Sequence, residues 1–192
     1  MNLEALMEIS LEQRVQDAVE TTLAYFTTAP EGQRDFSFDK AWTVKLFNVL
    51  AEVGQKQGYT ICSSKLASYK DSILFGEWLF DQCWLKWAEN DEQSRIKDVA
   101  IVLESEWSRD PIAILCDFEK LPLARADLRV MVFQQRSRVA AHMIFERLRK
   151  TVEGFTKSVP GDRYLFCAYI MKEREFIYEK YQYVRTGKLE NR

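Results

Sequence analysis

Apolar residues recur every three or four positions in two segments near the start of the chain. In the first segment, Leu3 to Phe26, residues such as Leu11, Val15 and Val19 follow this period, which places them on one face of a helix. The second segment, Phe38 to Gln57, has the same period and contains a glycine near its end, where helices commonly terminate. The pattern therefore predicts two amphipathic helices.

Short runs of aromatic and β-branched residues follow these helices. Residues 59–62 and Ile73 to Leu85 are rich in such residues, and the second run predicts a long buried strand. Val99 to Trp107 begins with the most continuous aliphatic run of the chain, which is typical of a central strand covered on both faces. Trp87 to Asp98 is charged and is expected to be a loop, while Leu128 to Phe133 predicts a further strand.

Helical and strand patterns alternate again in the second half. Asp110 followed by Pro111 provides an N-cap and a first helical residue, so a helix is expected from there toward Leu121, where a proline follows. Val139 to Gly154 repeats the helical period, and residues 163–184 predict a closing β-hairpin. Because helical segments are spread among the strands, we expect an α/β fold with a mixed central β-sheet flanked by helices.

Length and composition favour a single domain that spans residues 1–192. A chain of 192 residues can bury one sizeable core, and its 7 glycines and 4 prolines are too few for a linker-rich protein. No segment approaches the roughly 20 uncharged apolar residues of a membrane helix. The first ten residues carry two glutamates where a signal peptide carries basic residues. We expect a cytoplasmic protein without membrane contact.

The cysteines give no sign of a metal site or a disulfide framework. Cys62, Cys83, Cys116 and Cys167 lie in apolar segments without a CxxC pair, and the chain has one histidine. Zinc sites and disulfide-rich domains normally show closer spacings or more such ligands. We therefore expect four reduced core residues.

The charge of the chain bears on nucleic-acid binding. A net charge of −2 provides little general attraction to nucleic acid, which counts against a protein that simply coats DNA. It does not count against an enzyme that offsets its own acidic site with a bound cation. The most basic part of the chain contains Arg136, Arg138, Arg147, Arg149, Lys150 and Lys157. By default these residues form a solvated helix face, but beside an acidic site they would form a track for phosphates.

Three acidic residues interrupt or end predicted buried strands. Asp81 lies in the first of these strands, and Glu104 and Glu106 end the second. A carboxylate is costly in such a place unless it is paired or bound to a cation. The two-residue spacing turns Glu104 and Glu106 to one face of their strand, about 7 Å apart. If the two strands are neighbours, three carboxylates converge on a space of cation size, with the oxygen ligands that suit Mg²⁺.

This order of elements, together with the acidic residues, resembles the PD-(D/E)XK nuclease superfamily, which has a restriction-endonuclease-like core of helix, three strands, helix and strand. On that resemblance, Asp81 stands for the aspartate of the second strand and Glu104 for the acidic residue of the third, and both would hold Mg²⁺ or Mn²⁺. Glu52 stands for the acidic residue that some members carry on the first core helix. Glu106 occupies the usual lysine position, so the motif is ExE, and Lys120 is positioned as a lysine that has migrated to the next helix.

The resemblance covers residues 38–133, with residues 1–37 as an N-terminal helical extension and residues 134–192 as a C-terminal helix and hairpin. It implies metal-dependent hydrolysis of phosphodiester bonds in nucleic acid, with DNA as the expected substrate. Glu106 would orient or deprotonate the attacking water, and Lys120 would neutralise the phosphate. The missing ExK lysine and the near-neutral charge favour an alternative, a catalytically inactive protein of this fold that serves as a binding or assembly module.

The candidate residues also have ordinary structural interpretations. An ExE motif at the end of a strand is often a solvated terminus. Asp81 would then pair with a lysine, such as Lys86 across the sheet, or cap a turn. Glu52 precedes Lys56 by four residues, which is a favourable order for a surface ion pair on a helix. The aromatic hairpin over residues 176–183 offers an edge or a face for self-association, so a homodimer is a further expectation.

Tryptophan side chains are candidates for stacking on nucleic-acid bases. Most of the five tryptophans are expected to be core residues. Trp107 directly follows the acidic pair, so it is the first candidate for contact with a substrate.

Overall fold

The structure is a computed structural model that describes residues 9–28, 38–63, 66, 78–88 and 95–185. Its helices are α1 (Leu11–Thr28), α2 (Phe38–Lys56), α3 (Pro111–Phe118) and α4 (Arg138–Gly154), and a short 3₁₀ helix, η2, spans Leu121–Leu123. Its strands are β1 (Thr60–Cys62), β2 (Gln82–Trp87), β3 (Ile96–Glu106), β4 (Leu128–Gln135), β5 (Arg163–Ile170) and β6 (Glu175–Gln182). None of the helices in these ranges combines the length and apolar composition needed to cross a membrane.

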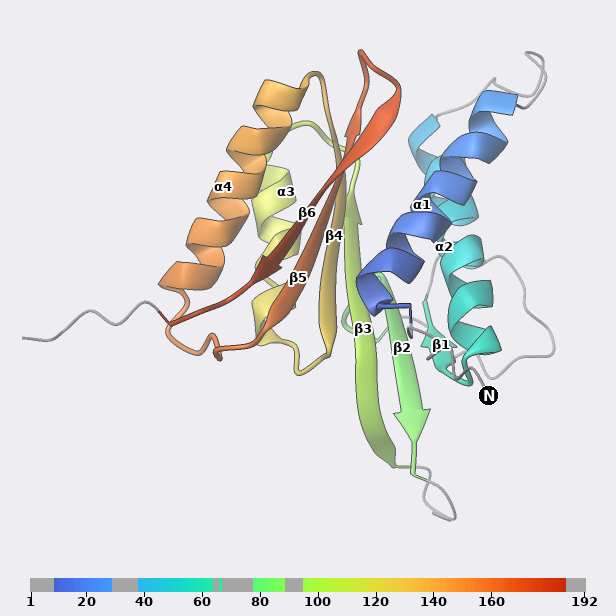
Figure 1. Cartoon of the computed structure of the whole chain (residues 1–192), viewed down its shortest axis with the longest axis vertical. Helices are drawn as coiled ribbons and strands as arrows, with labels where there is room; N and C mark the ends of the chain where they lie inside the picture. Colours follow the sequence, from blue (N-terminus) through green and yellow to red (C-terminus); the bar gives the residue numbers. More distant parts are fainter. Residues whose placement is uncertain (1–8, 29–37, 64–65, 67–77, 89–94, 186–192) are drawn as a thin grey trace, which may run out of the picture.

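The six strands form one mixed sheet in the order β1-β2-β3-β4-β5-β6. The pairs β3–β4 and β4–β5 are parallel, and the pairs β1–β2, β2–β3 and β5–β6 are antiparallel. Parallel neighbours require a crossover connection, and α3 and α4 supply the two crossovers on one face of the sheet (Figure 1). α1 and α2 cover the opposite face. The expected mixed sheet flanked by helices is confirmed.

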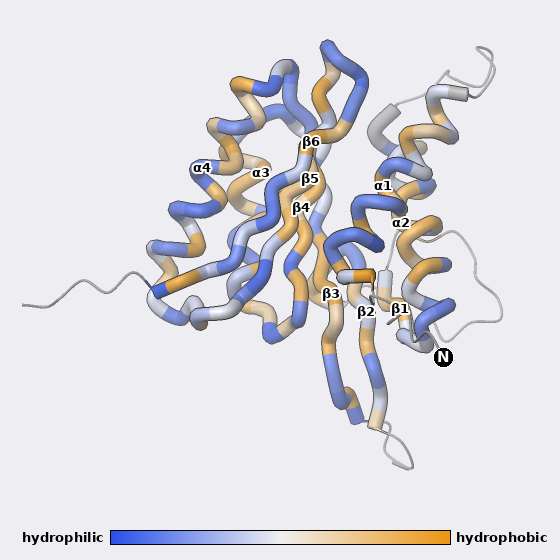
Figure 2. Tube along the Cα trace, in the orientation of Figure 1, coloured by the Kyte–Doolittle hydropathy of each residue, from blue (hydrophilic) through white to orange (hydrophobic). Residues whose placement is uncertain are grey.

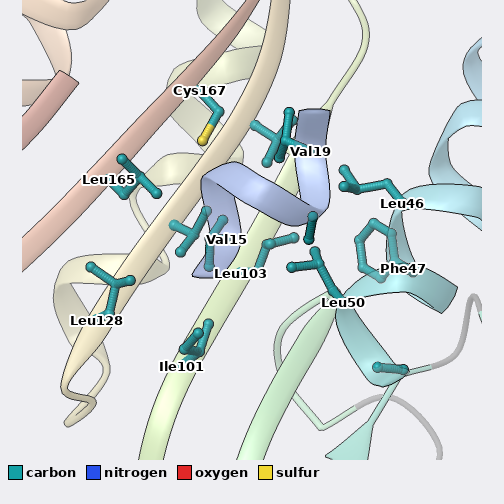
Figure 3. Packing of buried hydrophobic residues seen from close by; sticks show 14 of the residues in the cluster. Val15, Val19, Leu46, Phe47, Leu50, Ile101, Leu103, Leu128, Leu165 and Cys167 are labelled. Carbon is teal, nitrogen blue, oxygen red and sulfur yellow. The ribbon is translucent and has the colours of Figure 1, made fainter. Parts of the chain in front are cut away.

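Helices bury both faces of the sheet, which explains why the central strands are apolar throughout. Ile101 and Leu103 of β3 belong to the core under α1 and α2, together with Val15 and Val19 of α1 (Figure 3). Val102, between them, belongs to the second core under α3 and α4. Figure 2 shows hydrophobic residues concentrated along β3, β4 and β5. Alternate side chains of one strand therefore enter two different apolar layers.

Most predicted elements are confirmed with small shifts at their ends. The boundaries of α2 and α4, the capped start of α3 at Asp110 and the closing hairpin all follow the sequence pattern. α1 begins at Leu11, and residues 3–8 of the predicted helix lie outside the described residues. α3 ends at Phe118 and does not continue toward Leu121, because the chain turns there into η2. Cys62, Cys83 and Cys167 are buried, as expected, but Cys116 is exposed and is therefore not a core residue.

The predicted strand from Ile73 to Leu85 is wrong over residues 78–81, which precede β2. Residues 67–77 lie outside the described residues, and β2 begins only after a turn that contains Trp78, Leu79 and Phe80. Leu79 has a left-handed backbone conformation, with φ 68°, which ends any regular strand at this point. The prediction failed because aromatic and aliphatic content alone does not separate a strand from an apolar turn.

The charged segment from Trp87 to Asp98 is not entirely a loop. Both β2 and β3 extend into it, and Lys86 pairs in register with Asp98. Residues 89–94 of the expected loop lie outside the described residues. Opposite charges that face each other across a ladder stabilise it. These strand ends therefore form without the run of apolar residues by which strands are predicted from the sequence. Lys86 is thus not the partner of Asp81 across the sheet.

The aromatic residues of the closing hairpin pack within the chain. Phe176 is buried in the core under α1 and α2, and the hydroxyl of Tyr178 donates a hydrogen bond of 2.6 Å to Glu20 of α1. On the other face, Tyr181 stacks on Phe166 of β5. These contacts use part of the surface that suggested self-association, and the homodimer stays a prediction.

Gly54 near the end of α2 allows this helix to approach β1 and β2 closely. A Cβ atom at this position would lie 2.6 Å from Cδ1 of Ile61 and 2.9 Å from the indole ring of Trp84. Both of these side chains are buried, so neither has free space into which it can move. The glycine is therefore required by packing.

The Gly54→Ala variant should be less stable than the unaltered protein. The added methyl group overlaps buried atoms, and overpacking of this kind costs about 1–3 kcal/mol, which outweighs the gain of up to about 1 kcal/mol in helix propensity. Gly154→Ala, in α4, is the matched control, because nothing lies within 4 Å of its Cβ position. Urea unfolding should show a lower midpoint for Gly54→Ala alone, and equal midpoints would contradict the packing argument.

Candidate active site at the ends of β2 and β3

Asp81 lies just before β2, at the end of the β2–β3 ladder. The ladder ends at the pair Gln82–Leu103, and Asp81 and Glu104 are the next residues of the two segments, close enough for the charge of Asp81 to act on Glu104. Oδ2 of Asp81 accepts hydrogen bonds from the backbone N–H of Ser105 at 2.9 Å and from its hydroxyl at 3.0 Å. The carboxylate therefore binds a backbone donor of β3 at the point where the ladder ends.

Glu104 is 1% exposed and points to the same side of β3 as Val102, under α3 and α4. In the parallel register it lies beside Met131 of β4, an apolar neighbour. Its Oε2 lies 3.2 Å from Nζ of Lys120, whereas its Oε1 is buried without a hydrogen-bond partner among the described residues. A charged oxygen without a partner in such surroundings carries a large desolvation cost.

Burial changes the pKa values of two side chains at this site. Burial, followed by the charge of Asp81, raises the pKa of Glu104 to about 7, against the opposing effect of Lys120. Burial also raises the pKa of the nearby Cys83 thiol to about 12, so this cysteine is a neutral packing residue and not a nucleophile. Near neutral pH, Glu104 is thus poised between its protonated and ionised forms.

Lys120 links the end of α3 to the acidic pair. Its Nζ lies 2.8 Å from Oδ1 of Asp117 and 3.2 Å from Oε2 of Glu104. Desolvation alone would lower the pKa of Lys120, but the hydrogen bonds and charges of Asp117 and Glu104 raise it above the usual value. The ammonium group is therefore charged. Asp117 was not identified from the sequence, although its i, i+3 spacing from Lys120 is the signal that could have found it.

Glu52 lies apart from this pair, whereas Glu106 follows Glu104 by two residues on β3. Glu106 is half-buried on β3, and its Oε1 accepts a hydrogen bond from the backbone N–H of Ser108. Glu52 is on the exposed side of α2, the helix that covers the opposite face of the sheet. Within the ranges that the structure describes, no recorded contact joins Glu52 to Asp81 or Glu104.

The expected convergence of three carboxylates is not found in the described part of the chain. No group of three or more histidine, cysteine, aspartate or glutamate side chains there is arranged to hold a metal ion. Two carboxylates, from Asp81 and Glu104, do lie side by side, with Lys120 against the second. The spacing of the ExE motif correctly put Glu104 and Glu106 on one face, but the turn after the strand engages Glu106.

Two buried glutamines at the end of β4 hold the segment that follows Glu106. Nε2 of Gln134 donates to the carbonyl oxygen of Trp107, and Nε2 of Gln135 donates to that of Arg109 at 3.2 Å. Trp107 is itself buried, and its Nε1 donates to Thr43 at 2.7 Å. The sequence singled out Trp107 as a substrate contact, but it packs inside the fold.

Three of the six basic residues singled out after β4 form ion pairs. Arg138 forms ion pairs with Glu173 and Glu175, and Arg149 pairs with Glu179. Lys150 pairs with Glu146 on the surface of α4. These contacts fit the solvated helix face better than a continuous track for phosphates.

Comparisons with known proteins add little to this geometry. No protein-family model matches the chain, and no curated protein matches it significantly in sequence. Among solved structures, it is similar to E. coli MS115-1 NucC in its cAAA-bound form, with 13% sequence identity and a TM-score of 0.39 over 90% of this chain and 84% of that chain. A similarity at this level does not establish a shared activity, so the argument for function rests on the side chains.

In metal-free buffer, the protein should lose stability as the pH rises from about 4.5 to about 7. The pKa of Glu104 is about 7 in the folded protein, against an ordinary value of 4.5. The folded state therefore holds the proton more tightly than the unfolded state over this window. This pH-dependent part of the free energy of unfolding amounts to roughly 2–3 kcal/mol and should be absent in Glu104→Gln. Urea unfolding at pH 5 and pH 8 measures it, and an equal difference between the two proteins at both pH values would contradict the raised pKa.

Proposed function

We propose that this protein is a divalent-metal-dependent hydrolase of phosphodiester bonds in nucleic acid, with DNA as its substrate. The observation that carries the proposal is the buried Oε1 of Glu104, which lies next to Asp81 and within reach of Lys120 and has no hydrogen-bond partner in the part of the chain that the structure describes. A buried carboxylate oxygen of this kind is stabilised by a cation. The resemblance of the chain to the PD-(D/E)XK nuclease superfamily points to the same residues.

The side chains at this place fit Mg²⁺ or Mn²⁺. Mg²⁺ is commonly held by only one or two carboxylates, with water and phosphate oxygens completing its shell, so Asp81 and Glu104 are sufficient protein ligands. A bound cation would polarise the scissile phosphate and lower the pKa of a coordinated water. Asp81, whose Oδ2 accepts two hydrogen bonds from Ser105, is proposed as the second carboxylate ligand.

The remaining residues would act on the substrate directly. Lys120 is 46% exposed at its side chain and is held in place by Asp117, so its ammonium group is proposed to bind a phosphate oxygen and to stabilise developing negative charge. Glu106 lies two residues from Glu104 on the same strand face, and we assign it the role of general base toward water. The proposal gives Glu52 no step, because it lies on the exposed side of α2.

A binding module without catalytic activity is the second candidate. Two observations favour it: Glu106 occupies the position at which the superfamily usually carries lysine, and Lys120 is ion-paired with Glu104. An ammonium group in that position competes with a cation for the same carboxylate. Metal binding and cleavage therefore need separate measurements.

Millimolar Mn²⁺ should raise the melting temperature of the unaltered protein. A cation at ten times its dissociation constant adds about 1.4 kcal/mol of stability, or roughly 3–6 °C for a chain of this size. Asp81→Asn and Glu104→Gln should each lose the shift relative to their own metal-free midpoints. Glu146→Gln is the control, since this carboxylate lies on the surface of α4 in an ion pair with Lys150, and it should keep the shift. An unchanged midpoint in the unaltered protein would argue against the metal site.

Cleavage of DNA with Mg²⁺ or Mn²⁺ should depend on Glu104 and Lys120. Loss of a group that stabilises transition-state charge commonly costs about 100-fold or more in rate, so Glu104→Gln and Lys120→Ala should both fall at least that far. Lys150→Ala, on α4, should retain the rate. Plasmid and single-stranded DNA are the substrates, and absence of cleavage by the pure unaltered protein would favour the binding module.

A further inference from the structure

A cavity opens beside the candidate active site. Its volume is about 460 Å³, which lies in the range of pockets that hold small organic groups. Its wall is mainly apolar and comes from the turn before β2 (residues 78–80), from Val102 of β3 and from Leu123 of η2. Lys120 and Arg125 add positive charge. The cavity thus combines an apolar surface with two cationic side chains.

Two residues that line this cavity place it next to the acidic pair. Lys120 lines the cavity and also lies 3.2 Å from Glu104. Val102 precedes Glu104 by two residues on the same face of β3, a separation of about 7 Å along a strand. A group bound in the cavity would therefore lie beside the carboxylates that are proposed to hold the cation.

Large apolar side chains at the cavity are exposed to solvent. Trp78 is 40% exposed, Leu79 is 73% exposed and Leu123 is 68% exposed. Leu79 is held outward by a left-handed backbone conformation, which is unfavourable for a bulky residue. Clustered exposed apolar side chains around a hollow are typical of a binding surface.

We propose that this cavity holds one unpaired base of the substrate strand, next to the phosphate that the acidic pair and Lys120 act on. The inference rests on the proposed function and narrows its substrate to strands in which a base is free to leave the stack. A base offers a flat apolar face to Trp78, as in proteins that bind single strands. The adjoining phosphates match the charges of Lys120 and Arg125.

The base-pairing state of the substrate follows from the shape of the site. A base in an intact duplex is stacked and paired, so a duplex must expose a base before it can enter a pocket. Single strands pay no such cost. The unaltered protein should therefore bind a short single strand more tightly than a duplex of the same sequence.

Fluorescence anisotropy with labelled oligonucleotides tests the proposal, with Ca²⁺ in place of Mg²⁺ and with DNA and RNA strands of the same sequence. A single abasic site is moved along the strand. At the position that occupies the cavity, its affinity for the unaltered protein should fall by about 5-fold or more, which is the usual effect of losing one stacked base. This arm requires no change to the protein.

Variants then connect this loss to the cavity. Trp78→Ala should bind the intact single strand about 5-fold or more weakly and should no longer distinguish intact from abasic strands. Trp78→Phe, which keeps an aromatic face, should restore most of the affinity, and Leu123→Ala should show a smaller loss. Ile112→Ala is the matched control, since this residue of α3 is 67% exposed and does not line the cavity.

The outcomes separate the cavity from the catalytic proposal. Equal affinity for intact and abasic strands at every position, or strand binding that Trp78→Ala leaves unchanged, would overturn the base pocket even if the protein cleaves DNA. Base-dependent binding that requires Trp78 would support the pocket even if no cleavage is found. A preference for the DNA strand or for the RNA strand identifies which nucleic acid supplies the base.

Discussion

Burial of the Glu104 carboxylate is the constraint on which the candidate site depends. β3 is apolar on both faces because helices cover both faces of the sheet, so a carboxylate in this strand is placed where its neutral form is favoured. Asp81 adds negative charge beside it, and Lys120 offsets part of that charge. Asp81, just before β2, and Lys120, just after α3, are thus the two charged groups that act most strongly on this side chain. A bound cation would offset the desolvation cost that remains at Oε1, which has no hydrogen-bond partner among the described residues.

The parts of the fold that the sequence predicted well are those with strong local signals. The aliphatic run after Val99 marks β3, and the Asp110 cap with Pro111 marks the start of α3. Such patterns determine an element through its own hydrogen bonds and burial, without distant partners. The proximity of Asp81 and Glu104 followed from the assumption that their segments are neighbours, which the β2–β3 register bears out.

The remaining features depend on contacts between distant residues or on turn chemistry, which periodicity does not record. The turn at Leu79 has the composition of a strand, yet its left-handed backbone ends the ladder. Glu106 has the spacing of a ligand, but the turn that follows gives it a backbone N–H to bind. Trp107 stood next to the acidic pair in the sequence, whereas Trp78, in the turn before β2, is the tryptophan that lines the cavity.

Lys120 connects the metal-binding and base-binding parts of the proposal. In the absence of a cation, its ammonium group is the partner of Oε2 of Glu104, and its side chain also lines the cavity. A cation on Glu104 would compete with that ion pair and would leave the ammonium group to face a phosphate. Because coupling between two ligands is reciprocal, a strand whose phosphate draws Lys120 away from Glu104 would in turn strengthen cation binding. Lys120 would thus oppose the binding of a cation alone but favour the binding of a cation and a phosphate together.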